Sequence, residues 1–430
     1  MKERFDLIVV GAGPAGTMAA YIAAKAGLRV IIFERGEQPG TKNMFGGVLF
    51  CHDLAEVIPD FWDSAPIERV VIEERYYLVS DDSATTIAHR EKAFSQPPYN
   101  AATIMRAKFD KWFADQAVAA GALLVCETLV EGLIMENGKC VGVRTGREDG
   151  DVLADCVIVA EGVNSLLTRD AGIHKEWKSH EVGVGVKELI KLPKEVIENR
   201  FNLTNNEGIA MRILGLTSGM MGGVFLYTNK ESISIGMVAM VQDMAKHGYK
   251  QYDLMEEIKA HPMIAPLIEG GHTIEYTAHM VPEQGLKSVP QLVHDGLLIA
   301  GDAAMVSNLL TGEGVNLAMT TGRLAGEAVV SAKEKGDFSY NGLYRYQSAL
   351  ENSYVMKDMR QFKDFTGFLH DNPDMMNLYP QLANEFLGGL LKASGRPRGE
   401  TARALLREMK KKKSYTAIGK DMWRAWRAIR

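Results

Sequence analysis

The chain has 430 residues, of which 46% are hydrophobic and 24% charged, and its formal net charge is −5. These values are typical of a globular protein and exclude a disordered or fibrous one. Because single hydrophobic cores stop growing at roughly 250–300 residues, the length predicts two or three packed units and excludes a lone small binding module.

A strand, a tight turn and a helix are predicted at the start of the chain. Residues 5–10 are mostly apolar and β-branched, and residues 17–26 favour a helix. Between them, Gly11 allows the turn, Gly13 lets the backbone approach a pyrophosphate, and Gly16 permits close packing of strand and helix. The unpaired N–H groups of the helix start would face the phosphates. This segment supplies the first candidate cofactor-binding residues: Gly11, Ala12, Gly13, Pro14, Ala15 and Gly16.

An acidic residue ends the second predicted strand, residues 29–33. Glu34 lies 18 residues after Gly16, the spacing at which a carboxylate accepts hydrogen bonds from a ribose hydroxyl, and Arg35 beside it joins the candidate site. An acid here disfavours a 2′-phosphate, so the cofactor is NAD or FAD rather than NADP. The chain has no second strand–GxGxxG–helix unit, which argues against a separate nicotinamide domain.

Two further candidates follow along the chain. Gly46 and Gly47, in the loop of residues 41–50, would let the backbone approach a flavin ring, although a plain turn explains them equally well. Arg106 opens a predicted helix at 109–120 and is a partner for a phosphate or a neighbouring carboxylate, or an ordinary surface arginine.

Two distant segments favour a flavin. An apolar strand at 152–160 leads into Glu161 and Gly162, and another at 297–300 leads into Gly301 and Asp302. After the second strand a helix is predicted at 317–330, and its N-terminus would stabilise a ring that becomes negatively charged on reduction. The candidates at that helix start are Gly312, Gly314, Val315 and Asn316.

The C-terminal part is predicted to be helical, with breaks at Asn372-Pro373 and Arg396-Pro397. Residues 362–391 are rich in apolar side chains. From Lys392 onward the chain carries 13 Lys or Arg and three acids, a balance of +10 against −15 for the rest. An apolar helical region beside a basic tail is typical of a peripheral anchor on an anionic membrane, and an interface for a partner subunit or a solvated helix is the alternative. Nucleic-acid binding is not expected, because only the tail is basic and no aromatic platform is interleaved with it.

The order of these motifs resembles the FAD-dependent superfamily of p-hydroxybenzoate hydroxylase, geranylgeranyl reductases and electron-transfer flavoprotein:quinone oxidoreductases. The form Ala160-Glu161-Gly162 is similar to the quinone oxidoreductases, whereas most hydroxylases have Asp-Gly at this point. Further matches to that family lie at 184–189, 222–227, 261–271, 276–278 and 285–290. The resemblance extends from residue 1 to about residue 357.

The resemblance implies an α/β fold. A discontinuous Rossmann-like FAD domain would comprise 1–78, 99–183 and 286–335, with an inserted α+β quinone or substrate domain at 184–285 and a helical region at 336–430. The cofactor would be one non-covalent FAD. Tyr276 and Gly285 are the candidates for the quinone pocket, with a core aromatic as the alternative for Tyr276.

The positions of the cysteines indicate which branch of this family the chain resembles. Longer family members carry a four-iron cluster on a fused domain, but no cysteine follows Cys156 here, and such clusters require thiolates. No metal site is predicted. The pattern is similar to the FixC branch, which implies a separate ferredoxin-like iron–sulfur subunit, a two-subunit electron-transfer flavoprotein as electron donor and quinone as acceptor. That branch belongs to assemblies that oxidise NADH and split its electrons.

The expected location is the cytoplasm, peripherally on the inner face of the cell membrane, since no secretion signal and no apolar stretch of 18 residues is found. No catalytic nucleophile is predicted. Two other functions remain open at this point, a geranylgeranyl-type lipid reductase and a flavin-dependent aromatic hydroxylase.

Overall fold

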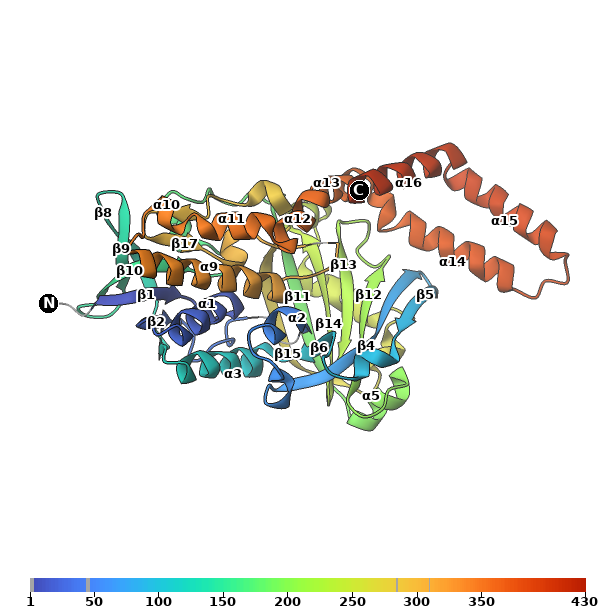
Figure 1. The fold of residues 1–430 in the computed structure, drawn as a ribbon. Coiled ribbons are helices and arrows are strands. Elements are labelled where there is room, and N and C mark those ends of the chain that lie inside the picture. Colours follow the sequence, from blue (N-terminus) through green and yellow to red (C-terminus); the bar gives the residue numbers. More distant parts are fainter. Residues whose placement is uncertain (1–3, 44–46, 284, 309) are drawn as a thin grey trace. The chain divides into compact units, whose positions relative to one another are not determined.

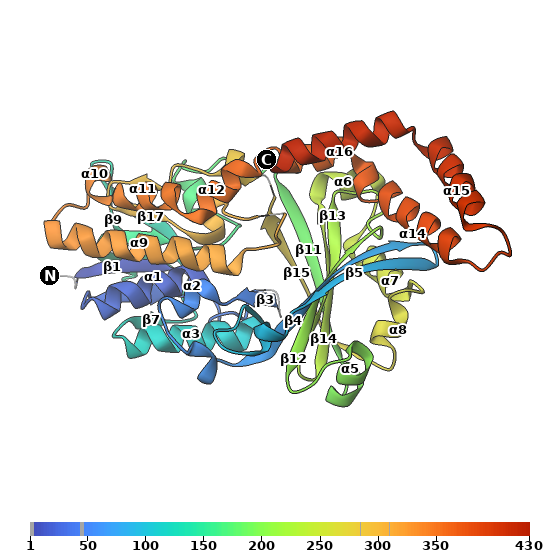
Figure 2. The same cartoon turned by 45° about the vertical axis from the view of Figure 1, so that its right-hand side comes forward.

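The computed structural model describes residues 4–43, 47–283, 285–308 and 310–430. The chain divides into two compact units, drawn in Figures 1 and 2. The first unit comprises Met1–Ile67, Pro98–Val182 and Met280–Arg360, and the second comprises Glu68–Pro97, Gly183–His279 and Gln361–Arg430.

The first unit is built on a largely parallel sheet flanked by helices. Its strands are β1 (Arg4–Val10), β2 (Val30–Phe33), β3 (Gly47–Phe50), β6 (Ala101–Ile104), β7 (Leu123–Val125), β8 (Val130–Glu136), β9 (Lys139–Thr145), β10 (Asp151–Val159), β16 (Val293–His294) and β17 (Leu297–Ile299). Its helices are α1 (Pro14–Lys25), α2 (His52–Ala55), α3 (Arg106–Ala119), α4 (Leu166–Asp170), α9 (Val315–Lys335), α10 (Tyr340–Leu343), α11 (Arg345–Asn352) and α12 (Tyr354–Gln361). Short 3₁₀ turns lie at Phe61–Asp63, Gly285–Ser288 and Gly301–Ala304.

The main sheet of this unit has the strand order β16-β17-β10-β1-β2-β7, and β9 and β8 extend it from β10. The pairs β17–β10, β10–β1, β1–β2 and β2–β7 are parallel. Strands buried on both faces need continuous apolar runs, as residues 7–10 show. Strands β3 and β6 form an antiparallel pair.

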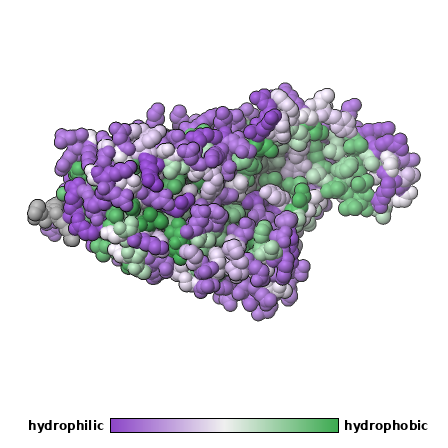
Figure 3. Space-filling model, in the orientation of Figure 1, coloured by the Kyte–Doolittle hydropathy of each residue, from purple (hydrophilic) through white to green (hydrophobic). Residues whose placement is uncertain are grey.

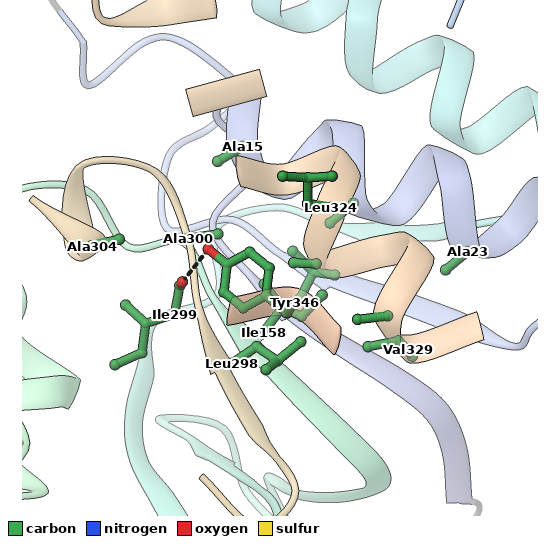
Figure 4. Close-up of a cluster of buried hydrophobic side chains, with 14 of the residues drawn as sticks. Ala15, Ala23, Ile158, Leu298, Ile299, Ala300, Ala304, Leu324, Val329 and Tyr346 are labelled. Atoms are coloured by element: carbon green, nitrogen blue, oxygen red, sulfur yellow. Dashed lines mark hydrogen bonds between the residues drawn. The ribbon is translucent and has the colours of Figure 1, made fainter. Parts of the chain in front are cut away.

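Small side chains let α1 and α9 approach each other closely. A Cβ on Gly322 of α9 would lie 2.1 Å from the Ala15 carbonyl oxygen of α1, and a Cβ on Gly326 would lie 2.8 Å from that of Ala19. Figure 4 shows part of the core that these helices form with the sheet. There the buried Tyr346 hydroxyl donates to the Ile299 carbonyl over 2.8 Å, so the polar tip of the ring is satisfied.

The second unit is an antiparallel-rich sheet with helices. Its strands are β4 (Ile67–Ser80), β5 (Ser83–Arg90), β11 (Val182–Lys191), β12 (Glu207–Leu214), β13 (Gly222–Thr228), β14 (Ser232–Met240) and β15 (His272–Pro282). Its helices are α5 (Lys194–Phe201), α6 (Val241–His247), α7 (Gln251–Ala260), α8 (Ala265–Ile268), α13 (Phe365–Asp371), α14 (Leu378–Leu391), α15 (Arg398–Lys412) and α16 (Tyr415–Ile429), with 3₁₀ turns at Lys92–Ser95 and Pro373–Met375.

The sheet of the second unit runs in the order β15-β11-β14-β13-β12-β4, and β5 pairs with β4. Alternate residues of the strands, such as Ile233, Ile235 and Met237, enter a core with α5 and α7. Arg69 is fully buried at the start of β4, where its guanidinium donates to the carbonyls of Asn229 (2.6 Å) and Glu207 (2.9 Å).

The units group two segments differently from the boundaries that the sequence predicts. Those boundaries place residues 68–78 in the FAD domain, but β4 is one continuous strand that pairs in parallel with β12 along residues 70–78. They also place 336–430 in one helical region. Asn384 of α14 donates to the Leu78 carbonyl (3.0 Å) and accepts from the Thr85 hydroxyl (2.6 Å), which fixes this helix to the β4–β5 hairpin.

The α/β fold class and the helical C-terminal region are confirmed. The predicted helix at 109–120 begins at Arg106, and the one at 317–330 extends over α9. Of the described helices, none is long and apolar enough to cross a membrane.

Candidate functional site

Three predicted loops meet at one edge of the sheet in the first unit. Val10 ends β1 opposite Val159 of β10, and Val159 lies opposite Ile299 of β17. Since these neighbouring strands are parallel, the chain leaves all three at their carboxyl ends, the edge at which open α/β sheets bind ligands.

Glycines bring these loops into contact. Gly11 has a φ of +100°, and a Cβ there would lie 2.4 Å from the Ala160 carbonyl oxygen. Gly301 has a φ of +69°, and its Cβ would lie 2.8 Å from the Ala15 Cβ. Both positions therefore require glycine, because an L side chain would be strained there and would collide with the adjacent loop.

Two other glycines fit a bound dinucleotide. Gly13 and Gly314 cap α1 and α9, and both have negative φ angles, −75° and −150°. A Cβ on either would meet no protein atom within 4 Å. Neither the backbone conformation nor packing calls for glycine at these helix starts, so the open space suits a group from outside the chain. The residues present fit FAD, with its pyrophosphate at α1.

Glu34 ties two of these segments together. Its carboxylate accepts from the Ala12 N–H (3.0 Å) and the Gly36 N–H (2.7 Å), and the residue is buried. The adjacent Arg35 is exposed. The structure thus places Glu34 beside the glycine-rich turn, while its role as ribose acceptor stays a prediction.

Arg106 forms an ion pair with a carboxylate, one of the readings that the sequence leaves open. Its guanidinium donates twice to Asp110, at 2.8 Å each. Burial alone would lower the pKa of Arg106, but the charge and hydrogen bonds of Asp110 and the charge of Asp302 raise it. The Asn43 side chain also donates to Asp110 over 3.3 Å, so this pair holds Asn43 against α3.

Glu161 accepts hydrogen bonds from the first turn of α4, which follows it closely in the chain. Its carboxylate accepts from the backbone N–H groups of Leu167 (2.9 Å) and Thr168 (3.0 Å) and thereby caps α4. Burial raises the pKa of Glu161, although these hydrogen bonds oppose the shift. Gly162 follows it with a φ of +79°.

The loop before α9 is ordered by a residue that the sequence analysis missed. Asn308 is buried, its side-chain oxygen accepts from the Leu310 N–H (3.1 Å), and its carbonyl accepts from the Gly312 N–H (2.9 Å). At the helix start, the Asn316 side chain donates to Glu313 (3.0 Å) and to the Tyr354 hydroxyl (3.3 Å). An Asn whose side chain accepts from the backbone N–H two residues later forms an Asx-turn, for which Asn is a favoured residue in the sequence.

The remaining candidates are dispersed. Gly46 lies outside the described residues, and Gly47 begins β3 opposite Ile104. Tyr276 belongs to the second unit, where its ring lies 6.2 Å from that of Tyr252, and Gly285 belongs to the first. The role of both as quinone-pocket residues stays a prediction.

Among the described residues, no group of His, Cys, Asp or Glu has the arrangement of a metal site. The four cysteines are free thiols. Burial raises the pKa of Cys51 to about 12 and that of Cys140 to about 11, so both are protonated at neutral pH.

Burial raises the pKa of Glu283, two residues before Gly285, to about 8. The folded chain therefore keeps a proton that the unfolded chain releases near pH 4.3. We expect the free energy of unfolding to fall by at most about 1.4 kcal/mol per pH unit from pH 5 to pH 8 on account of this group. Thermal denaturation across this range would show a flatter profile for Glu283→Gln, whereas the exposed control Glu136→Gln should keep the wild-type profile. An equal slope in both variants would contradict the assignment.

Comparison with known proteins identifies related families. Residues 6–177 match the family model described as FAD dependent oxidoreductase, 182–281 match "ETF-QO, ubiquinone-binding", and 365–430 match "ETF-QO/FixC family C-terminal domain", ETF-QO being electron-transfer flavoprotein:quinone oxidoreductase. A geranylgeranyl bacteriochlorophyll reductase-like protein from Thermoplasma acidophilum shares the fold, with a TM-score of 0.75 and 22% identity over 98% of this chain and 99% of that one.

Curated relatives are more similar in sequence. Protein FixC of Bradyrhizobium diazoefficiens is 42% identical over the full length of both chains. The probable electron transfer flavoprotein-quinone oxidoreductase YdiS of Escherichia coli is 41% identical over 95% of each. The chain is an FAD-dependent oxidoreductase, and it belongs to the ETF-QO/FixC family.

Proposed function

We propose that this chain accepts electrons from a two-subunit electron-transfer flavoprotein and passes them to membrane quinone. The observation that carries the proposal is that one chain combines helix starts at Gly13 and Gly314 that fit FAD with a match to the ubiquinone-binding model of this family. Bound FAD supplies one- and two-electron transfer. The chain's residues hold the dinucleotide at the helix starts of α1 and α9.

The finer assignment follows the FixC relatives. We propose that a separate ferredoxin-like subunit carries the iron–sulfur cluster, because no cysteine follows Cys156. We further propose that the chain works in an assembly that oxidises NADH and splits its electrons between quinone and a low-potential carrier.

We place the quinone ring on the strand face that carries Phe225 and Tyr227. Their rings are stacked, 5.1 Å apart with an interplanar angle of 15°, and both are half-buried. The Lys187 ammonium lies 5.6 Å from the Phe225 ring centre. Flat aromatic surfaces suit a planar quinone, and Tyr276 and Gly285 stay as the sequence-based candidates.

Anaerobic titration of the purified chain tests the function. Reduced electron-transfer flavoprotein should bleach the flavin absorbance, and a quinone should restore it. Bleaching by NADPH alone, or reduction of a prenyl double bond without any flavoprotein partner, would contradict the proposal.

We also propose that the C-terminal helices rest on an anionic membrane surface. Met422, Trp423, Trp426 and Ile429 are exposed on α16, while Asp421 on its other side accepts from the Tyr379 hydroxyl over 2.9 Å. The Asp421–Tyr379 hydrogen bond thus holds α16 so that these four apolar side chains face outward. Four of the apolar side chains at 362–391 are instead buried, namely Phe368, Leu369, Met376 and Leu382.

The basic and aromatic side chains of α16 also suit an anionic membrane surface. Arg427 and Arg430 lie 4.9 Å from the ring centres of Trp423 and Trp426, respectively. Figure 3 shows apolar surface gathered over the C-terminal helices, where Leu387, Leu391 and Leu406 are exposed. Trp and basic residues together favour the headgroup region of a bilayer.

Vesicle flotation tests this surface. The double variant Trp423→Ala/Trp426→Ala should bind phosphatidylglycerol-containing vesicles at least about tenfold more weakly than wild type, because it loses its interfacial anchors. Tyr340→Ala/Tyr344→Ala removes another exposed aromatic pair and serves as the matched control. Equal flotation of both variants would contradict the membrane proposal.

A further inference from the structure

A buried carboxylate links two segments that are predicted to approach the flavin. Asp53 lies on α2, only 3% exposed, immediately after β3 and the loop of residues 41–50. Its hydrogen bonds reach α9, whose N-terminus is the other predicted flavin contact. No motif in the sequence marks this residue.

Both oxygens of Asp53 accept from hydroxyl groups. Oδ1 accepts from the Thr320 hydroxyl (2.5 Å) and Oδ2 from the Tyr354 hydroxyl (2.9 Å). The Tyr354 hydroxyl in turn accepts from the Asn316 side chain (3.3 Å), in the first turn of α9. Acceptance on both oxygens is the pattern of an ionised carboxylate.

A second contact fixes the register of the two helices. Glu56 and Arg323 lie three residues after Asp53 and Thr320, respectively, and form an ion pair of 3.5 Å. Since i and i+3 positions share one face of a helix, both contacts lie along a single line. The carboxylate of Asp53 is therefore held beside the first two turns of α9.

This placement has an electrostatic consequence. The N-terminus of α9 carries a partial positive charge that favours added negative charge on a ring at its end. The negative charge of Asp53 opposes this stabilisation of a negatively charged ring. The partners of Asp53 are hydroxyl groups, which carry no net charge, so they do not neutralise the carboxylate as a cation would. Buried charges act over longer distances than exposed ones, because little water screens them.

We propose that Asp53 is a positioning residue whose charge, held by Thr320 and Tyr354, lowers the reduction potential of the bound FAD. The proposal rests on the predicted placement of the flavin at the start of α9. It does not depend on which partner delivers or receives the electrons.

Spectroelectrochemical titration of the FAD-loaded chain, without quinone or protein partner, tests it. Asp53→Asn removes the charge and keeps the shape, so the midpoint potential should become more positive. Tyr354→Phe removes a donor and leaves the carboxylate less compensated, so the potential should become more negative. A purely structural role would move both variants in the same direction. Glu136→Gln removes an exposed acid of the same unit and is the control, which should leave the potential unchanged.

Shifts of opposite sign support the proposal. Shifts of equal sign, or unchanged potentials in variants that retain FAD with the wild-type absorption spectrum, overturn it. Should Asp53→Asn fail to fold, Tyr354→Phe decides alone, since an unchanged or more positive potential is incompatible with the proposed charge effect. Loss of quinone reduction with the predicted shifts intact would count against the proposed function and leave this inference standing.

Discussion

Gly13→Ala is expected to weaken FAD binding by about 100-fold, or about 2.7 kcal/mol, and to leave the stability of the FAD-free chain nearly unchanged. An added Cβ would meet no protein atom, so it would disturb only the group that approaches the start of α1. Titration of the FAD-free chain with FAD gives the affinity, and thermal denaturation of the same sample gives the stability.

Gly322→Ala is the matched control, with the opposite result expected. Its Cβ would lie 2.1 Å from the Ala15 carbonyl oxygen, so the helices would have to separate, at about 1–3 kcal/mol or more. Unchanged FAD affinity in Gly13→Ala, or equal loss of stability in both variants, would show that Gly13 does not face the cofactor.

Arg69→Met should destabilise the second unit by about 3–5 kcal/mol. The side chain is fully buried, and its guanidinium donates to the carbonyls of Asn229, Glu207 and Lys230 and to the Glu198 carboxylate. Its removal would leave the Asn229 and Glu207 carbonyls without this donor in buried positions.

Urea denaturation measures this loss. Arg144→Met removes an exposed arginine that pairs with Asp151 over 2.9 Å, and little change is expected there because solvent screens such pairs. A similar effect of both substitutions would mean that the buried contacts contribute less than their geometry indicates.

Local patterns in the sequence were sufficient to predict the three strand ends that meet at one edge of the sheet. An apolar strand that ends in glycines and leads into a helix is encoded within about 30 residues, and the chain has such starts near residues 11, 160 and 301. The alternative left open for Arg106 was settled only by structure, because an Asp four residues later on a helix is a neighbour that also occurs on ordinary surfaces.

Long-range contacts were out of reach of such patterns. Asp53 meets partners 267 and 301 residues away, and β4 pairs with a strand more than 130 residues later. The outward face of α16 could have been found, since Tyr415, Met422, Trp426 and Ile429 recur at helical spacing. The apolar run at 362–391 is more prominent in the sequence, but four of its side chains, Phe368, Leu369, Met376 and Leu382, are buried.

The glycine contacts between α1 and α9 also fix the distance between the N-terminal ends of the two helices. Gly322 lies against Ala15 and Gly326 against Ala19, so the helices run side by side in the same direction. Because α1 begins one residue before Ala15 and α9 seven residues before Gly322, their positive ends are staggered by about 9 Å. Backbone-to-backbone packing makes this stagger of about 9 Å rigid. A dinucleotide whose linker between phosphate and ring had an unsuitable length could therefore contact the N-terminus of only one of the two helices.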